Sequence, residues 1–135
     1  MDRYEKVWKD FEQNDVSHSV AHYLLAIASF RAESHGPRAA DVSRMLGVSR
    51  NAVSLQMTSL KSSGFISVDE KHRISLTEKG QIISARIASK RHTMNVFFAE
   101  VLGVSDDIAE SDACKVEHLI SDSTGEALSK FVRFL

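Results

Sequence analysis

The sequence predicts a mainly α-helical fold, in which a helix-turn-helix with a small β-hairpin precedes a second, all-helical region. Two observations support this prediction. Apolar residues recur three and four residues apart along most of the 135 residues, which is the period of amphipathic helices. The pattern changes to strict alternation between Phe65 and Leu76, where two short runs flank a polar turn and favour a pair of strands.

The first two predicted elements are amphipathic helices. One covers residues 1–15 and ends at Asn14-Asp15, and the other covers residues 16–34 and stops before Gly36-Pro37. Their apolar positions are Tyr4, Val7, Trp8 and Phe11 in the first helix and Val20, Tyr23, Leu24, Ile27 and Phe30 in the second.

Residues 38–66 are typical of a helix-turn-helix. Gly47 provides the turn, Ser49 is in position to cap the second helix, and Gly64 ends it. The hairpin that follows completes a winged helix. The predicted inward positions are Ala40, Val42, Met45 and Leu46 in the first helix and Ala52, Val53, Met57 and Leu60 in the second.

Three further helices complete the chain. Thr77 is expected to cap a long helix that reaches about Val101, and Leu102-Gly103-Val104 breaks it. Ser105 opens the next helix, and Ser121 or Ser123 opens the last, which runs to Leu135. We therefore expect an extra N-terminal helix at 1–15, a winged helix at 16–80 and a helical domain at 81–135. The core positions expected in the long helix are Ile82, Ile83, Ile87, Met94, Phe97 and Phe98.

Composition and charge narrow the class of protein. The chain is 43% hydrophobic and 26% charged, as in an ordinary globular protein, and its single cysteine excludes an internal disulfide. No signal segment or long apolar run is present, so we expect a cytoplasmic protein with no membrane partner. Residues 31–91 hold eleven Lys/Arg against five Asp/Glu, whereas the rest holds six against thirteen. The middle of the chain is therefore basic, and its ends are acidic.

The second helix of the helix-turn-helix has the residues of a DNA-reading helix. Arginine can pair with guanine, and asparagine or glutamine with adenine, in the major groove. Lys71, His72 and Arg73 in the hairpin would contact phosphates or a minor groove. A winged helix used only for protein contact, with a merely solvated hairpin turn, is the alternative. The candidate DNA-binding residues are Ser49, Arg50, Asn51, Ser54 and Gln56 in the helix, and Lys71 and Arg73 in the hairpin.

Cys114, Glu117 and His118 lie within one arc of a helix, at about 100° per residue. A thiolate, a carboxylate and an imidazole on one face are the donors of a metal site. The alternative is a small buried cysteine beside a solvated helix face.

The terminal helices are strongly apolar for so short a chain. They could close a single core, or they could form a dimer interface. A homodimer is favoured, because two half-sites on a duplex require a pair of recognition helices related by a two-fold axis. The C-terminal residues concerned include Phe131, Phe134 and Leu135.

The order of these elements resembles the metal-dependent repressors of the DtxR and MntR family. The specific similarity lies in Arg91-His92, Leu102-Gly103-Val104 and Asp112-x-Cys114-x-x-Glu117-His118, and it extends from about His22 to the C-terminus. The resemblance implies a dimer in which Fe(II) or Mn(II) fixes the spacing of the recognition helices. It also implies His22 and His92 as ligands beside Cys114, Glu117 and His118.

The chain departs from the family pattern at Cys114, at His22 and Leu25 in the first family helix, and at Val96. Cys114 stands where the manganese branch has Glu and the iron branch has Cys, and a thiolate favours Fe(II), Co(II) or Zn(II). Leu25 and Val96 stand where family members place carboxylates, which weakens a second metal site, while His18 could assist His22. From the resemblance we expect the short architecture, without the SH3-like domain that the longer iron regulators carry. Fe(II) is nevertheless our first expectation.

The sequence thus predicts a metal-responsive repressor of metal homeostasis genes that binds operator DNA and has no small-molecule substrate. One alternative is a winged-helix regulator that answers to a small molecule or to oxidation of Cys114. A hydrolytic metalloenzyme is disfavoured because no nucleophile or oxyanion donors accompany the ligands, and no enzymatic activity is expected. A structural zinc module that only mediates protein contacts would unfold on losing metal.

Overall fold

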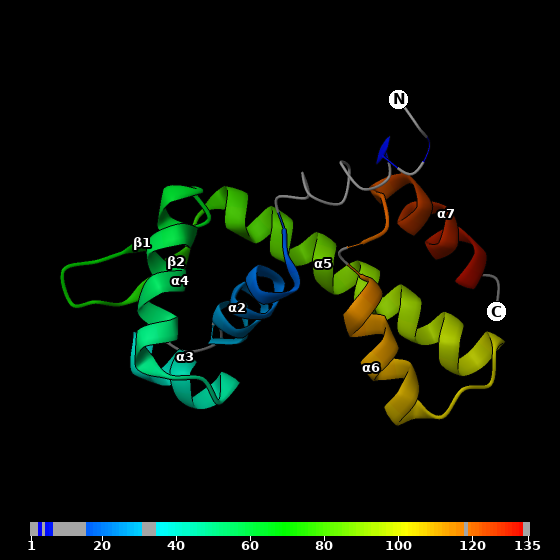
Figure 1. Ribbon diagram of the computed structural model, residues 1–135, viewed down its shortest axis with the longest axis horizontal. Helices are drawn as coiled ribbons and strands as arrows, with labels where there is room; N and C mark the ends of the chain where they lie inside the picture. Colours follow the sequence, from blue (N-terminus) through cyan, green and yellow to red (C-terminus); the bar gives the residue numbers. More distant parts are fainter. Residues whose placement is uncertain (1–2, 4, 7–15, 31–34, 118, 134–135) are drawn as a thin grey trace. The chain divides into compact units, whose positions relative to one another are not determined.

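The computed structural model describes residues 3, 5–6, 16–30, 35–117 and 119–133, and it is mainly helical (Figure 1). It divides into two compact units, one of residues 19–88 and one of residues 89–135 with 1–18. The division falls inside the helix α5 (Glu78–Val96), and the domain limits at 15 and 80 stay predictions. The residues that define the expected first helix, namely Tyr4, Val7, Trp8 and Phe11, lie outside the described residues, as do Phe134 and Leu135.

The unit of residues 19–88 contains the expected helix-turn-helix and hairpin. The two strands are antiparallel, with Ile66 opposite Leu76 and Val68 opposite Ile74. Figure 1 shows the hairpin extending beside α4. The elements in chain order are α2 (His18–Ser29), α3 (Ala39–Leu46), α4 (Arg50–Ser62), β1 (Ile66–Val68), β2 (Ile74–Leu76) and the first part of α5.

The predicted stop and start residues of this unit are confirmed. Gly47 ends α3 in the left-handed conformation, with φ of 66°, which glycine adopts without steric cost. The hydroxyl of Ser49 accepts a hydrogen bond from the amide of Ala52 at 3.1 Å and so caps α4. Thr77 caps α5 through the amide of Gly80, also at 3.1 Å. The turn between α3 and α4 is therefore built as the sequence predicts.

The core of this unit contains most of the expected apolar residues. Leu24, Val42, Val53 and Leu60 are at most 1% exposed. The expectation that Ile82 packs inward is wrong, since it is 46% exposed. Positions two apart on a helix differ by about 200°, so burial of Ser84 turns Ile82 to solvent. Met45 and Ala52 were likewise expected inside, and both are exposed.

The second unit consists of the end of α5, the π-helical turn η2 (Phe97–Val101), α6 (Asp106–Val116) and α7 (Asp122–Val132). The expected break at 102–104 is confirmed, with Gly103 at φ of 72°. The ring of Phe97 lies against that of Phe131, with centroids 6.3 Å apart. The hydroxyl of Ser121 accepts a hydrogen bond from the Thr124 amide, which decides between the two candidate caps of the last helix.

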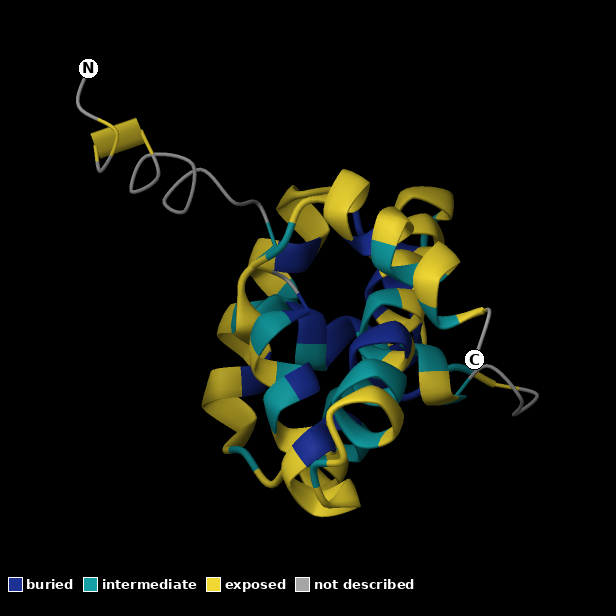
Figure 2. Ribbon diagram, turned by 90° about the vertical axis from the view of Figure 1, so that its right-hand side faces the viewer, coloured by how far each residue is buried: buried dark blue, intermediate teal, exposed yellow. Residues whose placement is uncertain are grey.

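Burial follows the helical period in both units. Figure 2 shows exposed positions on the outer sides of the helices and buried positions on their inner sides. Within the described residues, no helix combines the length and the apolar character that crossing a membrane requires.

Candidate functional site

Arg91 makes a two-point contact with Glu117. The Nε atom of Arg91 lies 2.5 Å from Oε2 of Glu117, and the Nη2 atom lies 2.7 Å from Oε1. Glu117 is completely buried, whereas the side chain of Arg91 is 31% exposed. A buried carboxylate is costly unless it is paired and hydrogen-bonded, and the planar guanidinium satisfies both of its oxygens at once. The end of α6 is thereby fixed to α5.

Cys114 faces the same guanidinium. Its Sγ atom lies 3.5 Å from Nη2 of Arg91, one helical turn before Glu117. Burial raises the pKa of the Cys114 thiol, and the positive charge of Arg91 partly opposes this effect. The hydrogen bonds with Glu117 raise the pKa of Arg91, so the guanidinium stays charged. A sulfur and a carboxylate therefore converge on one cation.

Lys90, the residue before Arg91, makes a second connection from α5. Its Nζ atom lies 2.7 Å from Oδ1 of Asp122 and 3.1 Å from the carbonyl oxygen of Ile120. The aliphatic part of Lys90 passes so close to Gly125 that a Cβ there would lie 3.3 Å from its Cγ. Two consecutive cations thus hold the end of α6 and the start of α7. Sequence reasoning gave neither cation a role, although their adjacency was a visible signal.

The three predicted histidine ligands have different surroundings. His92 is exposed on α5. Among the described residues of the 89–135 unit, the ligand atoms of His92, Cys114 and Glu117 do not all lie within 4.8 Å of one another. His22 is half-buried on α2, one turn after His18, in the other unit. His118 lies outside the described residues. The roles of these three histidines stay predictions.

The outward face of α4 carries most of the predicted DNA-reading residues. Arg50, Asn51 and Ser54 are exposed at its N-terminal end. Gln56 is half-buried instead, and its amide donates a hydrogen bond to the hydroxyl of Ser19 at 3.0 Å. Sequence reasoning passed over Leu55, which is 76% exposed beside these residues. An exposed leucine here could contact a thymine methyl group, and its place one turn after Asn51 was the available signal.

The two predicted hairpin residues differ in their surroundings. Lys71 is exposed at the tip. The guanidinium of Arg73 donates a hydrogen bond to the carbonyl oxygen of Gly36 at 3.1 Å, and its backbone amide donates one to Asp69. Arg73 therefore ties the hairpin to the segment before α3, while Lys71 remains exposed at the tip.

Comparison with known proteins gives three kinds of similarity. The family described as iron dependent repressor, metal binding and dimerisation domain matches residues 77–135. An uncharacterized HTH-type transcriptional regulator of Methanocaldococcus jannaschii is 31% identical over 118 residues, which are 87% of this chain and 94% of that protein. The transcriptional regulator MntR of Salmonella typhimurium is 33% identical over 111 residues, covering 82% of this chain and 70% of that protein. The solved structure of the manganese regulator SloR superposes with a TM-score of 0.76 at 26% identity, covering 85% of this chain and 54% of that one.

Proposed function

Because the chain belongs to the DtxR/MntR family of metal-dependent transcriptional regulators, we propose that it is a homodimeric repressor that binds operator DNA when loaded with Fe(II) or Mn(II). The family depends on iron or manganese, so a divalent metal is the expected cofactor. Its members regulate transcription and are not enzymes, which confirms the expectation of no enzymatic activity.

The convergence of Cys114 and Glu117 on the Arg91 guanidinium is the observation that carries the proposal. Here a sulfur and a buried carboxylate already share one positive charge. This donor set fits a divalent cation, which would supply a compact double charge to the same two groups. Cys114 and Glu117 would hold the metal, with His92, His118 and His22 as the predicted nitrogen donors.

Glu117 links this site to the conformation of the unit. Both of its oxygens accept a hydrogen bond from Arg91, so a metal bound to Glu117 would either share this carboxylate with the guanidinium or displace it. Arg91 belongs to α5 and Glu117 ends α6. Loading would therefore change the charge balance of the ion pair that joins the two helices. A ligand shifts an equilibrium in this way only by binding one arrangement better than the other.

The chemistry of the two groups bears on the choice of metal. The thiol of Cys114 favours Fe(II), Co(II) or Zn(II) over Mn(II), which prefers oxygen donors. We therefore propose Fe(II) as the first candidate and Mn(II) as the second. Burial raises the pKa of the Cys114 thiol, so the thiolate is less favoured there than in an exposed cysteine. This disfavours the alternative in which oxidation of Cys114 is the signal, because the thiolate is the species that reacts.

DNA binding is supported by the exposed polar residues at the start of α4. Arg50, Asn51 and Ser54 are the proposed base contacts, and Ser49 fixes the helix start through its cap. Gln56 is left out because its amide is held by Ser19.

The homodimer is proposed to form through the second unit. The description of the matching family domain names dimerisation as one of its roles. The unit also exposes large apolar side chains that a second copy of the chain would cover. These are Val101, Leu102, Ile108, Leu119 and Phe131, each between 38% and 57% exposed.

The test is anaerobic binding of the reduced protein to its own promoter fragment, with Fe(II), Mn(II) or chelator present. We expect binding to appear with metal and to vanish with chelator. Glu117→Gln should abolish the metal effect, whereas Asp112→Asn, which removes a half-exposed carboxylate paired with Lys115 on the same helix, should not. Promoter binding that ignores metal and chelator alike would overturn the proposal.

A further inference from the structure

His18 lies close to the sulfur of the candidate metal site. It is the first residue of α2, and it belongs to the same compact unit as residues 89–135. A ring nitrogen of His18 and the Sγ atom of Cys114 lie within 4.8 Å of each other. Bonds of about 2.0–2.3 Å from one ion to nitrogen and sulfur place the two donors roughly 3.5–4 Å apart. A small side-chain rotation is therefore enough for both to bind one ion.

Both side chains can be reached from solvent. His18 is exposed, and Cys114 is half-buried with its Sγ atom 3.5 Å from Nη2 of Arg91. Cys114 thus stands between the exposed imidazole and the guanidinium that holds the buried Glu117. An ion can therefore meet His18 and Cys114 without opening the core of the unit.

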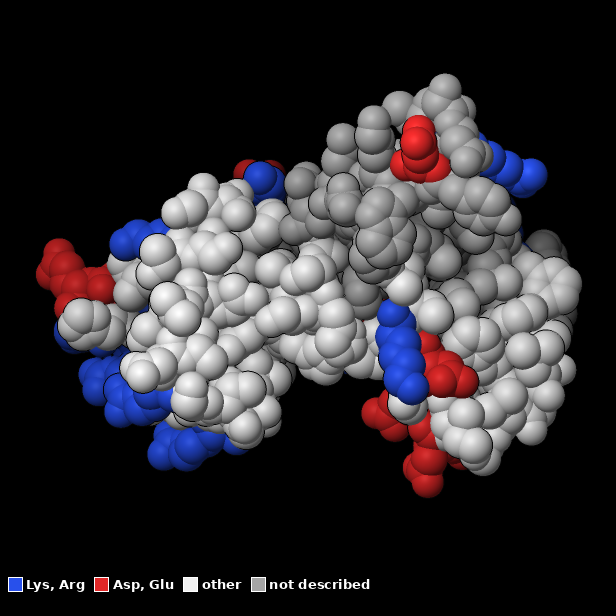
Figure 3. Space-filling model, viewed as in Figure 1, with Lys and Arg blue, Asp and Glu red and all other residues white. Residues whose placement is uncertain are grey.

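The helix that carries Cys114 is acidic. Figure 3 shows Asp and Glu side chains gathered over α6. Asp106 and Asp107 lie in its first turn, and Glu110 is exposed one turn before Cys114. A surface with one sign of charge raises the local concentration of counter-ions. The charge of α6 therefore favours a divalent cation beside Cys114.

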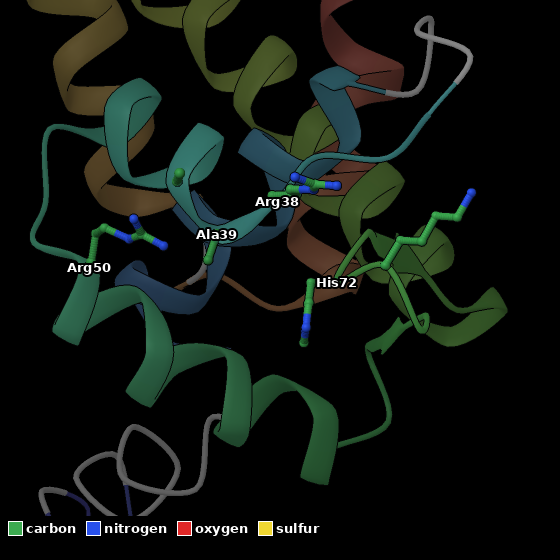
Figure 4. A pocket seen from close by; sticks show the side chains of 6 residues that line it. Arg38, Ala39, Arg50 and His72 are labelled. Atoms are coloured by element: carbon green, nitrogen blue, oxygen red, sulfur yellow. The ribbon is translucent and has the colours of Figure 1, made fainter.

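Another exposed histidine, His72, has the opposite surroundings. It lines a pocket of the other unit together with Arg38, Arg50 and Lys71, and Figure 4 shows it with the two arginines. None of the described residues that line this pocket is acidic or contains sulfur. Positive side chains repel a metal ion. Exposure alone therefore does not distinguish His18, whereas its position beside Cys114 does.

We propose that His18 is a metal ligand, which binds through a ring nitrogen the same ion as the Cys114 sulfur. The thiol releases its proton to solvent as the sulfur binds. The inference rests on the proposed function and adds a nitrogen donor to the ligands predicted there. Nitrogen and thiolate donors suit Fe(II), Co(II) or Zn(II), whereas Mn(II) prefers oxygen. His18 would therefore affect the choice of metal as well as the affinity.

The experiment titrates the reduced, metal-free protein with Co(II) under anaerobic conditions. Co(II) replaces Fe(II) as the probe, and its bond to a thiolate gives a charge-transfer absorption that reports on Cys114. Loss of a partner that merely orients a ligand weakens metal binding about 10- to 100-fold. In His18→Asn, the affinity for Co(II) should therefore fall at least about tenfold, and the affinity for Mn(II) should fall less. The absorption should persist at saturating Co(II), whereas Cys114→Ser should remove it.

His72→Asn is the matched control, and its affinity for Co(II) should equal that of the wild-type protein. Asparagine suits both positions, because it tolerates the left-handed backbone of His72, with φ of 62°, and is well accepted near a helix start. A second measurement needs no variant. On addition of Zn(II), the NMR resonances of the His18 ring nitrogens should shift, and those of His72 should not.

Two results would overturn the inference and leave the proposed function intact. One is equal Co(II) affinity of His18→Asn and His72→Asn, with the thiolate absorption present in both. The other is binding of Zn(II) to Cys114 with the His18 ring resonances unmoved. Failure of the wild-type protein to bind Co(II) or Zn(II) at all would instead refute the metal dependence on which the proposed function depends.

Discussion

Arg91 and Glu117 form an ion pair in which a fully buried carboxylate depends on one arginine from a neighbouring helix. Both oxygens of the carboxylate are engaged, and the thiol of Cys114 lies against the same guanidinium. In the metal-free protein Arg91 is thus the cation of the site. This gives Arg91 a role that can be separated experimentally from that of the metal ligands.

Arg91→Ala should strongly destabilise the metal-free protein. The substitution leaves Glu117 buried without its partner, and breaking a buried pair in this way costs roughly 3–5 kcal/mol. Urea unfolding in the presence of chelator measures the loss. Arg86→Ala serves as the control, since this arginine is exposed on the same helix and its removal should change the unfolding free energy by less than about 0.5 kcal/mol. Equal stability of the two variants would show that the pair contributes nothing.

Divalent metal should stabilise the Arg91→Ala variant more than it stabilises the wild-type protein. In the variant Glu117 has no competing cation, so metal binding has no hydrogen bonds to replace. A ligand that binds only the folded state raises its stability by an amount set by affinity and concentration. Thermal unfolding with Fe(II) or Mn(II) under anaerobic conditions provides the comparison. A smaller shift in the variant would mean that Arg91 assists metal binding and does not compete with it.

The order of the elements could be predicted from the sequence because local signals specify it. Gly47, Ser49 and Thr77 act within a few residues of themselves, and the structure has each in its predicted role. The alternating pattern of residues 65–76 likewise specifies the hairpin. Helix ends and turns are therefore the parts of this fold that the local sequence determines.

The candidate sites depend on contacts that no local pattern contains. Spacing places Cys114 and Glu117 on one helical face, but it does not show that Arg91, more than twenty residues away, occupies both. In the same way, the helical spacing of α4 predicts that Gln56 can contact DNA. Its hydrogen bond to Ser19 depends instead on the packing of α4 against α2, which the spacing does not show.

Gly36→Ala should distort the connection between the segment before α3 and the hairpin. The added Cβ would lie 2.2 Å from a backbone oxygen of Ile74, which cannot move without breaking the pairing of β2. Overpacking of this kind costs about 1–3 kcal/mol, and urea unfolding measures it. Gly47→Asn is the contrasting variant, because no atom lies within 4 Å of its Cβ position and asparagine tolerates positive φ. Its effect should be smaller, and the reverse order would contradict the packing assigned to Gly36.

Acid should loosen the hairpin tip before it unfolds the rest of the winged helix. The amide of Arg73, and then that of Lys71, donates to the Asp69 carboxylate and holds its pKa below the ordinary value of 3.8. A carboxyl whose pKa is lower in the folded state adds stability above its unfolded pKa and loses it as pH falls through the folded value. Hydrogen exchange of the Lys71 and Arg73 amides should therefore be slow from neutral pH down to about pH 4 and should lose protection below it. Asp69→Asn keeps a side-chain oxygen that can accept these bonds but has no proton to gain, so its protection should show no such step. A step of the same size in that variant would assign the acid transition to another group.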